Sequence, residues 1–334
     1  AVSFYIKCDK NKTVARKQRG IYNKYRNQKI LTDQRRVIMS RKDKEKKKKK
    51  TTGDYILTFV LIVAICVFCY AAFNLYHIYT EYKKGTDEYN SISEMAVTER
   101  DPDDTEDLGQ PENQPTAPIS IDFASLKSIN DDVIGWIYME ALPQISYPVV
   151  QGEDNNTYLH QTYEKNYNFA GTIFIDYENK RDFSDCNTLV YGHNMKNGSM
   201  FGSIHSFEDE TFFDGHPYIY VYTENERLTY EIYEAAKFTD VYIPSEYVIS
   251  SKDDRDQFLA DVREKVSDNK LHVREDMEIG EDDRLITLST CVSGERNHRY
   301  LVIGVLVETA LYRNNIFIKS GKSDSRIAHK RALW

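Results

Sequence analysis

The stretch "TLSTCVSGERNHRYLVIG", residues 287–304, contains two short apolar runs separated by a polar segment. The first run ends at Cys291, and Arg299 opens the second. Runs of β-branched and aliphatic residues bounded by polar and glycine residues predict strands. Cys291 is therefore expected at a strand end. It is either a buried filler there or a nucleophile with a cation beside it.

Similar runs occur throughout residues 119–310 and predict seven or eight strands. One later segment, residues 251–268, has apolar side chains at helical spacing, and Ser251 with Asp254 predicts a capping box at its start. Many strands with few helices favour a closed β-barrel with a few helical insertions over alternating βαβ units. The strand runs are "DVIGWIYM", "ISYPVVQ", "GTIFIDY", "NTLVYGH", "YIYVYT", "LTYEIYEAAKFTDVYI", "RLITLSTC" and "RYLVIGVLVE".

The N-terminal part of the chain predicts a membrane anchor. Residues 55–80 contain no Asp, Glu, Lys or Arg, and about 20 apolar residues suffice to cross a bilayer. A buried soluble helix and a cleaved signal peptide are the alternatives, but such length without charge favours one transmembrane helix. Residues 1–54 hold 19 Lys and Arg against 5 Asp and Glu. Because this basic tail lies next to an apolar span, it predicts a cytoplasmic N-terminus rather than nucleic-acid binding. The chain after residue 80 is then expected outside the cell.

The remaining boundaries follow from composition. Residues 81–118 carry 11 acidic and 3 basic side chains and four prolines, which predicts an extended linker. A catalytic domain is expected over 119–310, followed by a C-terminal tail, 311–334, of unassigned role. Met39 precedes the lysine run, so residues 1–38 are hypothesised to lie upstream of the native start.

Two cysteines, Cys186 and Cys291, lie beyond the expected span. A disulfide between them is one interpretation for an exported domain. Alternatively Cys291 is a reactive thiol, which needs a neighbouring imidazole or cation because a free thiol with a pKa of about 8.5 is mostly protonated at neutral pH. Cys186 would then be a packed small hydrophobe.

Among the eight histidines, His193 best fits a strand-end partner for such a thiol. It follows the run "NTLVY", and Gly192 allows the chain to turn there. His298 is close to Cys291 in sequence, but it alternates with Arg299, so only one of the two faces the cysteine side. The other histidines fall in the anchor, the tail or polar segments.

These residues resemble a known family. "TLSTC" followed by the arginine of "RYLVIG", with "TLVYGHNM" about 100 residues upstream, is similar to the sortases. "INDDVIGWI", "ISYPVVQGEDNNTYL", "AGTIFIDY" and the helix at 251–268 resemble class B sortases in particular. The resemblance covers about residues 119–310, and the family also implies the basic tail, single span and acidic linker.

The resemblance implies roles for matching positions. Cys291 would be the nucleophile, His193 the general acid and base, and Arg299 the group that stabilises the oxyanion or orients the substrate carbonyl. Arg296 competes for the last role, but the arrangement of Arg299 before Val302 and Gly304 matches the family's last strand. The resemblance implies substrate contacts at Ser289, Tyr191, Asn155 and Leu159.

The implied reaction is transpeptidation. The thiol would cleave a C-terminal sorting signal of secreted proteins through a thioester, and a peptidoglycan amine would resolve it. The implied partners are sorting-signal-bearing surface proteins, a peptidoglycan precursor or crosslink, and membrane lipid around residues 55–80. The family needs no metal or cofactor, and the sequence has neither metal-ligand spacing nor a phosphate loop. A thiol hydrolase or peptidase on the same barrel, or a non-catalytic wall-associated domain, remains an alternative.

Overall fold

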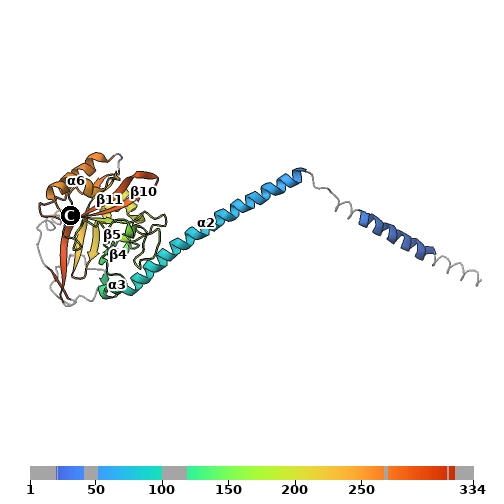
Figure 1. Ribbon diagram of the computed structural model, residues 1–334, viewed down its shortest axis with the longest axis horizontal. Helices are drawn as coiled ribbons and strands as arrows, with labels where there is room; N and C mark the ends of the chain where they lie inside the picture. Colours follow the sequence, from blue (N-terminus) through green and yellow to red (C-terminus); the bar gives the residue numbers. More distant parts are fainter. Residues whose placement is uncertain are drawn as a thin grey trace, which may run out of the picture. The chain divides into compact units, whose positions relative to one another are not determined.

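The computed structural model describes residues 20, 22–40, 52–99, 119–266, 270–313 and 316–319. The chain forms two compact units, Ala1–Leu75 and Tyr76–Trp334. The first unit contains an exposed helix over 22–40 and the first part of helix α2 (Thr52–Ala96) (Figure 1). By length and composition, α2 could cross a membrane. Its apolar stretch contains the whole of the expected span, residues 55–80.

The predicted linker is wrong over residues 81–99, because α2 continues to Ala96 and strand β1 (Val97–Glu99) follows. The buried residues of α2 are Gly85, Tyr89, Ile92 and Ala96. This spacing of four, three and four residues is a helical stripe, and it packs into the larger hydrophobic core of the second unit. The four linker prolines all lie at position 102 or later, so they do not interrupt the helix. Residues 100–118 lie outside the described part of the chain.

Tyr89 links the end of α2 to the chain just before strand β5 (Ile173–Ile175). Its hydroxyl donates to the carbonyl of Gly171 at 2.5 Å and lies 3.1 Å from Oγ1 of Thr172. We expect Tyr89→Phe to lower the free energy of unfolding by about 1–2 kcal/mol, because a buried carbonyl loses its donor. Urea denaturation of the detergent-solubilised full chain measures this. Tyr82→Phe is the control, because Tyr82 contacts Phe169 through its ring. An equal effect of both substitutions would contradict the assignment.

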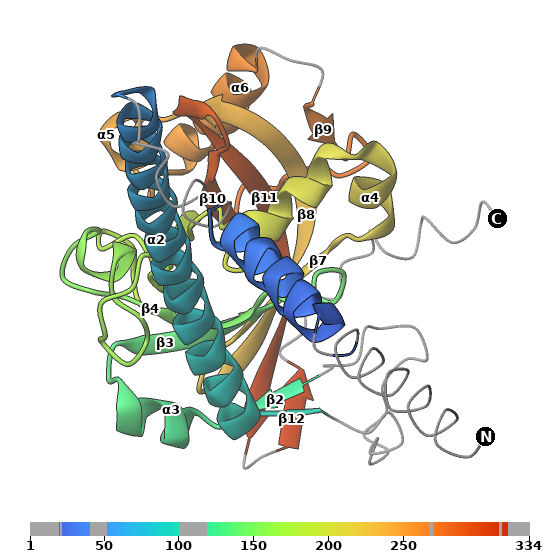
Figure 2. The same cartoon turned by 90° about the vertical axis from the view of Figure 1, so that its right-hand side faces the viewer.

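A closed β-barrel forms the second unit (Figures 1 and 2). Ten strands pair in the order β12-β11-β10-β6-β5-β4-β3-β7-β8-β9, and an additional pairing of β11 with β8 closes a ring of eight. The expected closed barrel with few helices is therefore confirmed. The strands are β3 (Val133–Tyr138), β4 (Ser146–Val150), β5 (Ile173–Ile175), β6 (Asn187–Tyr191), β7 (Tyr218–Tyr222), β8 (Glu226–Thr239), β9 (His272–Val273), β10 (Leu285–Val292), β11 (Glu295–Arg313) and β12 (Ile316–Lys319).

Short helices and turns connect the strands, and a separate β1–β2 pair precedes the barrel. These elements are β2 (Ile119–Ile121), α3 (Phe123–Ile129), η1 (Thr157–Leu159), η2 (Gly202–Glu208), α4 (Glu210–Gly215), α5 (Ile243–Glu246) and α6 (Lys252–Lys265). Ser251 caps α6 by accepting from the N–H of Asp254 at 3.3 Å. The reciprocal half of the predicted capping box is not formed, because the Asp254 carboxylate accepts from the N–H of Val248 instead.

The expected C-terminal boundary at residue 310 is also corrected. Strand β11 runs to Arg313, and Ala310 to Arg313 pair with β12. The barrel sheet therefore extends to Lys319. Residues 320–334 of the expected tail lie outside the described part of the chain.

Two hydrophobic cores lie on opposite faces of β10. Ile286 and Leu288 belong to the larger core, whereas Leu285 belongs to a second core that includes Phe258 and Val262 of α6. Alternation along a strand then assigns Cys291 to the face of Leu285. The barrel wall around β10 is thus covered by α6 on the face that carries the cysteine.

Candidate active site

Cys291 lies at the end of β10, directly opposite Arg299 of β11. Side chains of directly paired residues point to the same face of a sheet, with their Cβ atoms about 5 Å apart. The register shifts immediately after this pair, so that Val292 opposes Glu295. The Cys291 and Arg299 side chains therefore leave the same face of the sheet at the last regular pair before the bulge. The Cys291 side chain is exposed, so the bland alternative of a buried filler is wrong.

His193 approaches the same place from the other neighbour of β10. Strands β6 and β10 are parallel, and Tyr191 pairs with Ser289. His193 and Cys291 each follow this pair by two residues. Side chains two residues apart share a face, and neighbouring strands lie about 4.8 Å apart. The pairing thus brings His193, Cys291 and Arg299 to one end of three adjacent strands.

A main-chain carbonyl fixes the ring of His193. Its Nε2 lies 2.8 Å from the carbonyl oxygen of Leu159. A carbonyl only accepts, so Nε2 carries the proton and, in the neutral ring, Nδ1 has the lone pair. Burial lowers the pKa of His193, and the nearby His160 lowers it further, against the hydrogen bond to Leu159. The imidazole is therefore neutral at pH 7 and can accept a proton at Nδ1.

Two glycines permit this arrangement. A Cβ on Gly192 would lie 2.5 Å from Cδ1 of Ile173, so only glycine fits where the chain leaves β6. Gly171 has a φ of +58°, and a Cβ there would meet the carbonyl of Leu159 at 2.6 Å. That is the carbonyl bonded to His193. Close backbone approach at these two glycines thus positions both the ring and its acceptor.

The Arg299 guanidinium is tied to the turn after Cys291. Its Nη1 donates to the carbonyls of His298 at 3.1 Å and Arg296 at 3.3 Å. These contacts use Nη1, and the fork also carries N–H donors on Nε and Nη2. Arg296 is exposed and contributes its main-chain carbonyl. The imidazole of His298 lies 3.1 Å from Glu295 by Nδ1, away from the Cys291 pair.

The four predicted substrate-binding residues fall around the same strand ends. The hydroxyl of Tyr191 and the amide of Asn155 both donate to Oδ2 of Asp176, each at 2.9 Å. Ser289 is buried, with 5% of its residue surface exposed. Leu159 is half-buried and packs against the larger core, and its carbonyl holds His193. Their role in substrate binding stays a prediction.

Asp176 was missed by the sequence reasoning. It is fully buried, and besides Tyr191 and Asn155 it accepts from the Tyr242 hydroxyl at 3.1 Å and the Glu178 N–H at 2.9 Å. Burial, followed by the Asp176 charge, raises the pKa of Tyr191. One carboxylate thus holds three polar side chains in place. The signal in the sequence was an aspartate directly after the apolar run "TIFI".

Cys186 and Cys291, the two cysteines that follow α2, are both free, which excludes the disulfide alternative in this structure. Cys186 is half-buried, and its thiol donates to the carbonyl of Ser250 at 3.3 Å. It precedes β6, whereas the site follows β6. Cys186 therefore lies at the other end of that strand.

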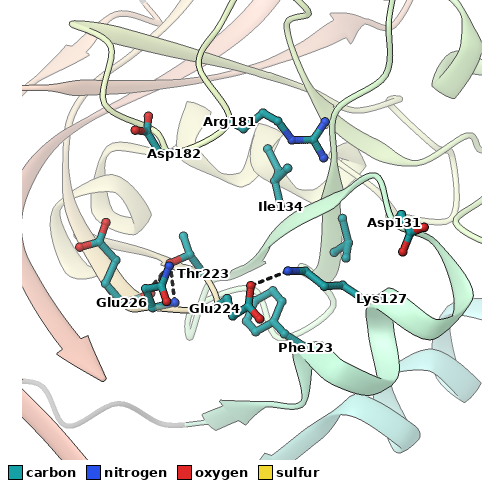
Figure 3. Close-up of a pocket in the computed structure, with 11 residues that line it drawn as sticks. Phe123, Lys127, Asp131, Ile134, Arg181, Asp182, Thr223, Glu224 and Glu226 are labelled. Atoms are coloured by element: carbon teal, nitrogen blue, oxygen red, sulfur yellow. Dashed lines mark hydrogen bonds and ion pairs between the residues drawn. The ribbon is translucent and has the colours of Figure 1, made fainter. Parts of the chain in front are cut away.

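A separate hollow is drawn in Figure 3. It is lined by α3, the start of β3 and the turn between β7 and β8, with the Lys127–Glu224 ion pair across it. Glu226 pairs with Leu311, at the opposite end of β11 from Arg299. This mixed-charge hollow contains none of the predicted site residues.

Comparison with known proteins agrees with this geometry. A model of the sortase domain matches residues 137–307. The chain belongs to the sortase family. This sortase is 35% identical over 173 residues to sortase B of Listeria monocytogenes, covering 51% of this chain and 67% of the relative. It is 29% identical over 192 residues to sortase B of Staphylococcus aureus, covering 56% and 75%.

Solved structures show the same fold. Clostridium perfringens sortase B superposes with a TM-score of 0.51 at 35% identity, covering 56% of this chain and 100% of that one. Bacillus anthracis sortase B superposes with a TM-score of 0.54 at 29% identity, covering 69% and 99%. The sequence-based prediction of a class B sortase is confirmed. This sortase is a cysteine transpeptidase that anchors proteins to the cell wall.

Proposed function

We propose that Cys291 is the nucleophile of this sortase, His193 its general acid and base, and Arg299 its oxyanion donor. The observation that carries the proposal is the strand register. It puts Cys291 directly opposite Arg299, and His193 lies two residues after the neighbouring strand β6 ends, at the level of Cys291. The alternative arginine, Arg296, sits in the exposed turn and binds Arg299 through its carbonyl.

The proposed reaction has two halves. The Cys291 thiol gives its proton to Nδ1 of His193 as the sulfur attacks a peptide carbonyl in a sorting signal and a C–S bond forms. The C–N bond then breaks as the leaving amine takes that proton from His193. Arg299 donates to the carbonyl oxygen as negative charge develops on it. An amine of the cell wall then attacks the thioester, gives its proton to His193 and releases the thiol. Asn155, Leu159, Tyr191 and Ser289 would line the groove for the signal.

We further propose a single-pass membrane protein with a basic cytoplasmic tail and an extracellular catalytic domain. The support is the uncharged stretch within α2 and the lysine run before it. Its partners would be sorting-signal-bearing surface proteins and a peptidoglycan precursor or crosslink amine. The stretch of α2 from residue 81 to 96 would then be a rigid support rather than a flexible linker.

The test separates transfer from hydrolysis. The detergent-solubilised full chain is incubated with a library of pentapeptide sorting signals and glycylglycine, and the products are identified by mass spectrometry. We expect peptides joined to glycylglycine for the recognised motif. Hydrolysed peptides alone would support the thiol peptidase alternative, and no cleavage would support the non-catalytic one.

The two arginines give a matched pair of variants. We expect Arg299→Ala to lower kcat/KM for ligation by roughly 10²-fold or more, as for other oxyanion donors. Arg299→Lys should recover only part of this, because an ammonium lacks the planar fork. Arg296→Ala should stay within about twofold, since alanine keeps the carbonyl that Arg299 uses. The reverse order of effects would transfer the role to Arg296.

A further inference from the structure

The main-chain carbonyl of Cys291 points toward the end of β6. Alternate residues of a parallel strand direct their carbonyls to the same neighbour, and the N–H of Gly192 donates to the Ser289 carbonyl at 3.2 Å. A regular continuation would bring the N–H of Asn194 to the carbonyl of Cys291. Strand β6 ends at Tyr191, however, before this bond can form. The carbonyl of the proposed nucleophile therefore needs another donor.

The side chain of Asn194 supplies that donor. Its Nδ2 lies 2.8 Å from the carbonyl oxygen of Cys291, 3.1 Å from Oγ of Ser293 and 3.0 Å from Nε2 of His205. Nε2 of His205 also lies 3.1 Å from the Cys291 carbonyl. The residue that directly follows His193 thus holds the backbone of Cys291. One side-chain amide replaces the missing bond of the ladder.

His205 and Glu208 orient this amide. Nδ1 of His205 lies 2.7 Å from Oε1 of Glu208 and therefore carries the proton, because a carboxylate only accepts. Nε2 of His205 then faces two groups: in the neutral ring it accepts from the Asn194 amide, and in the protonated ring it donates to the Cys291 carbonyl. The Asn194 amide keeps a hydrogen for the Cys291 carbonyl in both forms. The His205 ring stacks on Tyr300 at a centroid distance of 4.8 Å, which fixes its plane.

The carboxylate at the far end of this chain stays ionised. Burial raises the pKa of Glu208, but the hydrogen bonds from Lys270 and His205 outweigh burial and hold that pKa below its usual range. An ion pair joins Glu208 to Lys270. Glu208 therefore remains an acceptor for His205 at every pH at which the His193 ring is neutral.

We propose that Asn194 is a positioning residue of this sortase: it fixes the Cys291 thiol relative to the His193 ring, and His205 and Glu208 orient its amide. This inference rests on the proposed roles of Cys291 and His193. The hydrogen bonds of Asn194 go to the Cys291 carbonyl, Ser293 and His205, and none goes to the Cys291 sulfur. It acts through the carbonyl of Cys291, because a misplacement of about 1 Å between reacting groups can cost 10²-fold in rate.

The test is a double-mutant cycle on the full chain. We expect Asn194→Ala to lower kcat for ligation of the selected pentapeptide to glycylglycine by roughly 10-fold, with KM unchanged. His205→Phe keeps a ring on Tyr300 but removes both nitrogens, and should cost roughly threefold to 10-fold. Because His205 acts through Asn194, the double variant should be no slower than Asn194→Ala alone. Additive losses would overturn the chain from His205 to Asn194.

A second readout distinguishes positioning from general damage. The rate of Cys291 alkylation by iodoacetamide is followed against pH. In Asn194→Ala the profile should differ from that of the wild type, because the thiol is no longer held in place beside the His193 ring. Asn194→Asp has nearly the size of asparagine but no donor, and should lose the same rate. An Asp variant with unchanged kcat and an unchanged alkylation profile would overturn the proposal.

The controls are the same two kinds of substitution, Asn→Ala and His→Phe, at exposed positions away from Cys291. Asn225→Ala lies in the exposed β7–β8 turn, and His216→Phe follows α4 at the surface; both should keep the wild-type kcat and profile. The wild type decides separately on the proposed function. Absence of ligation by the wild-type chain, or of alkylation at Cys291, would reject the roles of Cys291 and His193 whatever the Asn194 variants do.

Discussion

Cys291→Ala is expected to abolish both cleavage of the sorting peptide and ligation to the amine, a loss of roughly 10⁴-fold or more. The reason is that the thioester cannot form without the sulfur, and the neighbouring Arg299 and His193 have no other nucleophile to assist. The fold should survive, because the Cys291 side chain is exposed at a strand end. Peptide turnover and intact-mass detection of the acyl-enzyme measure the loss, and circular dichroism checks the fold.

Cys186→Ala provides the matched control. This thiol is half-buried, donates to the carbonyl of Ser250, and precedes β6 rather than following it. Its removal should leave ligation within about twofold of the wild type. An acyl-enzyme that still forms in Cys291→Ala, or that no longer forms in Cys186→Ala, would show that Cys291 is not the nucleophile and would contradict the proposed active site.

The barrel was predictable because each of its strands can be recognised from its own local sequence. Runs such as 187–191 and 285–291 are β-branched, bounded by polar residues, and long enough for one barrel wall. The closure of β11 on β8 was not predictable in its register, because it joins residues 59 to 85 positions apart and depends on two register shifts. Periodicity reports which segments are strands and leaves their partners open.

The extension of α2 shows how composition can mislead. The acidic residues and prolines of 81–118 suggested one extended segment. The prolines are confined to its second half, and Tyr89, Ile92 and Ala96 form a stripe in its first half. An average over the whole segment concealed this stripe. A window of about 11 residues would have separated the two halves.

The catalytic candidates were predictable because strand-end chemistry combines with alternation. Cys291 and Arg299 follow from one hairpin, and alternation correctly turned His298 away from them. Asn194 and His205 were not predictable, since their contact with the Cys291 carbonyl depends on where β6 ends and how η2 returns. His205 lies in a polar segment and has no local signal. Only the folded chain brings it within 3.1 Å of the Cys291 carbonyl.

His193→Ala is expected to lower kcat/KM for ligation by roughly 10³-fold, within the range of a lost general acid and base. In the proposed mechanism the ring both accepts the thiol proton and protonates the leaving amine, so each half of the reaction is expected to slow. Labelling of Cys291 by a thiol-reactive peptide should weaken for the same reason. His216→Ala, at the surface after α4, should keep the wild-type rate.

The pH dependence distinguishes this role from a structural one. Burial lowers the pKa of His193 from its ordinary value of 6.5, so the neutral ring persists as the pH falls through that value. The acid limb of kcat/KM should therefore lie below pH 6.5 in the wild type and disappear in His193→Ala. The unfolded chain binds the proton at higher pH than the folded chain does. The His193 contribution to stability is thus fully present above pH 6.5 and is lost on acidification. A wild-type acid limb above pH 6.5, or one that survives the substitution, would contradict a buried, neutral His193 as the base.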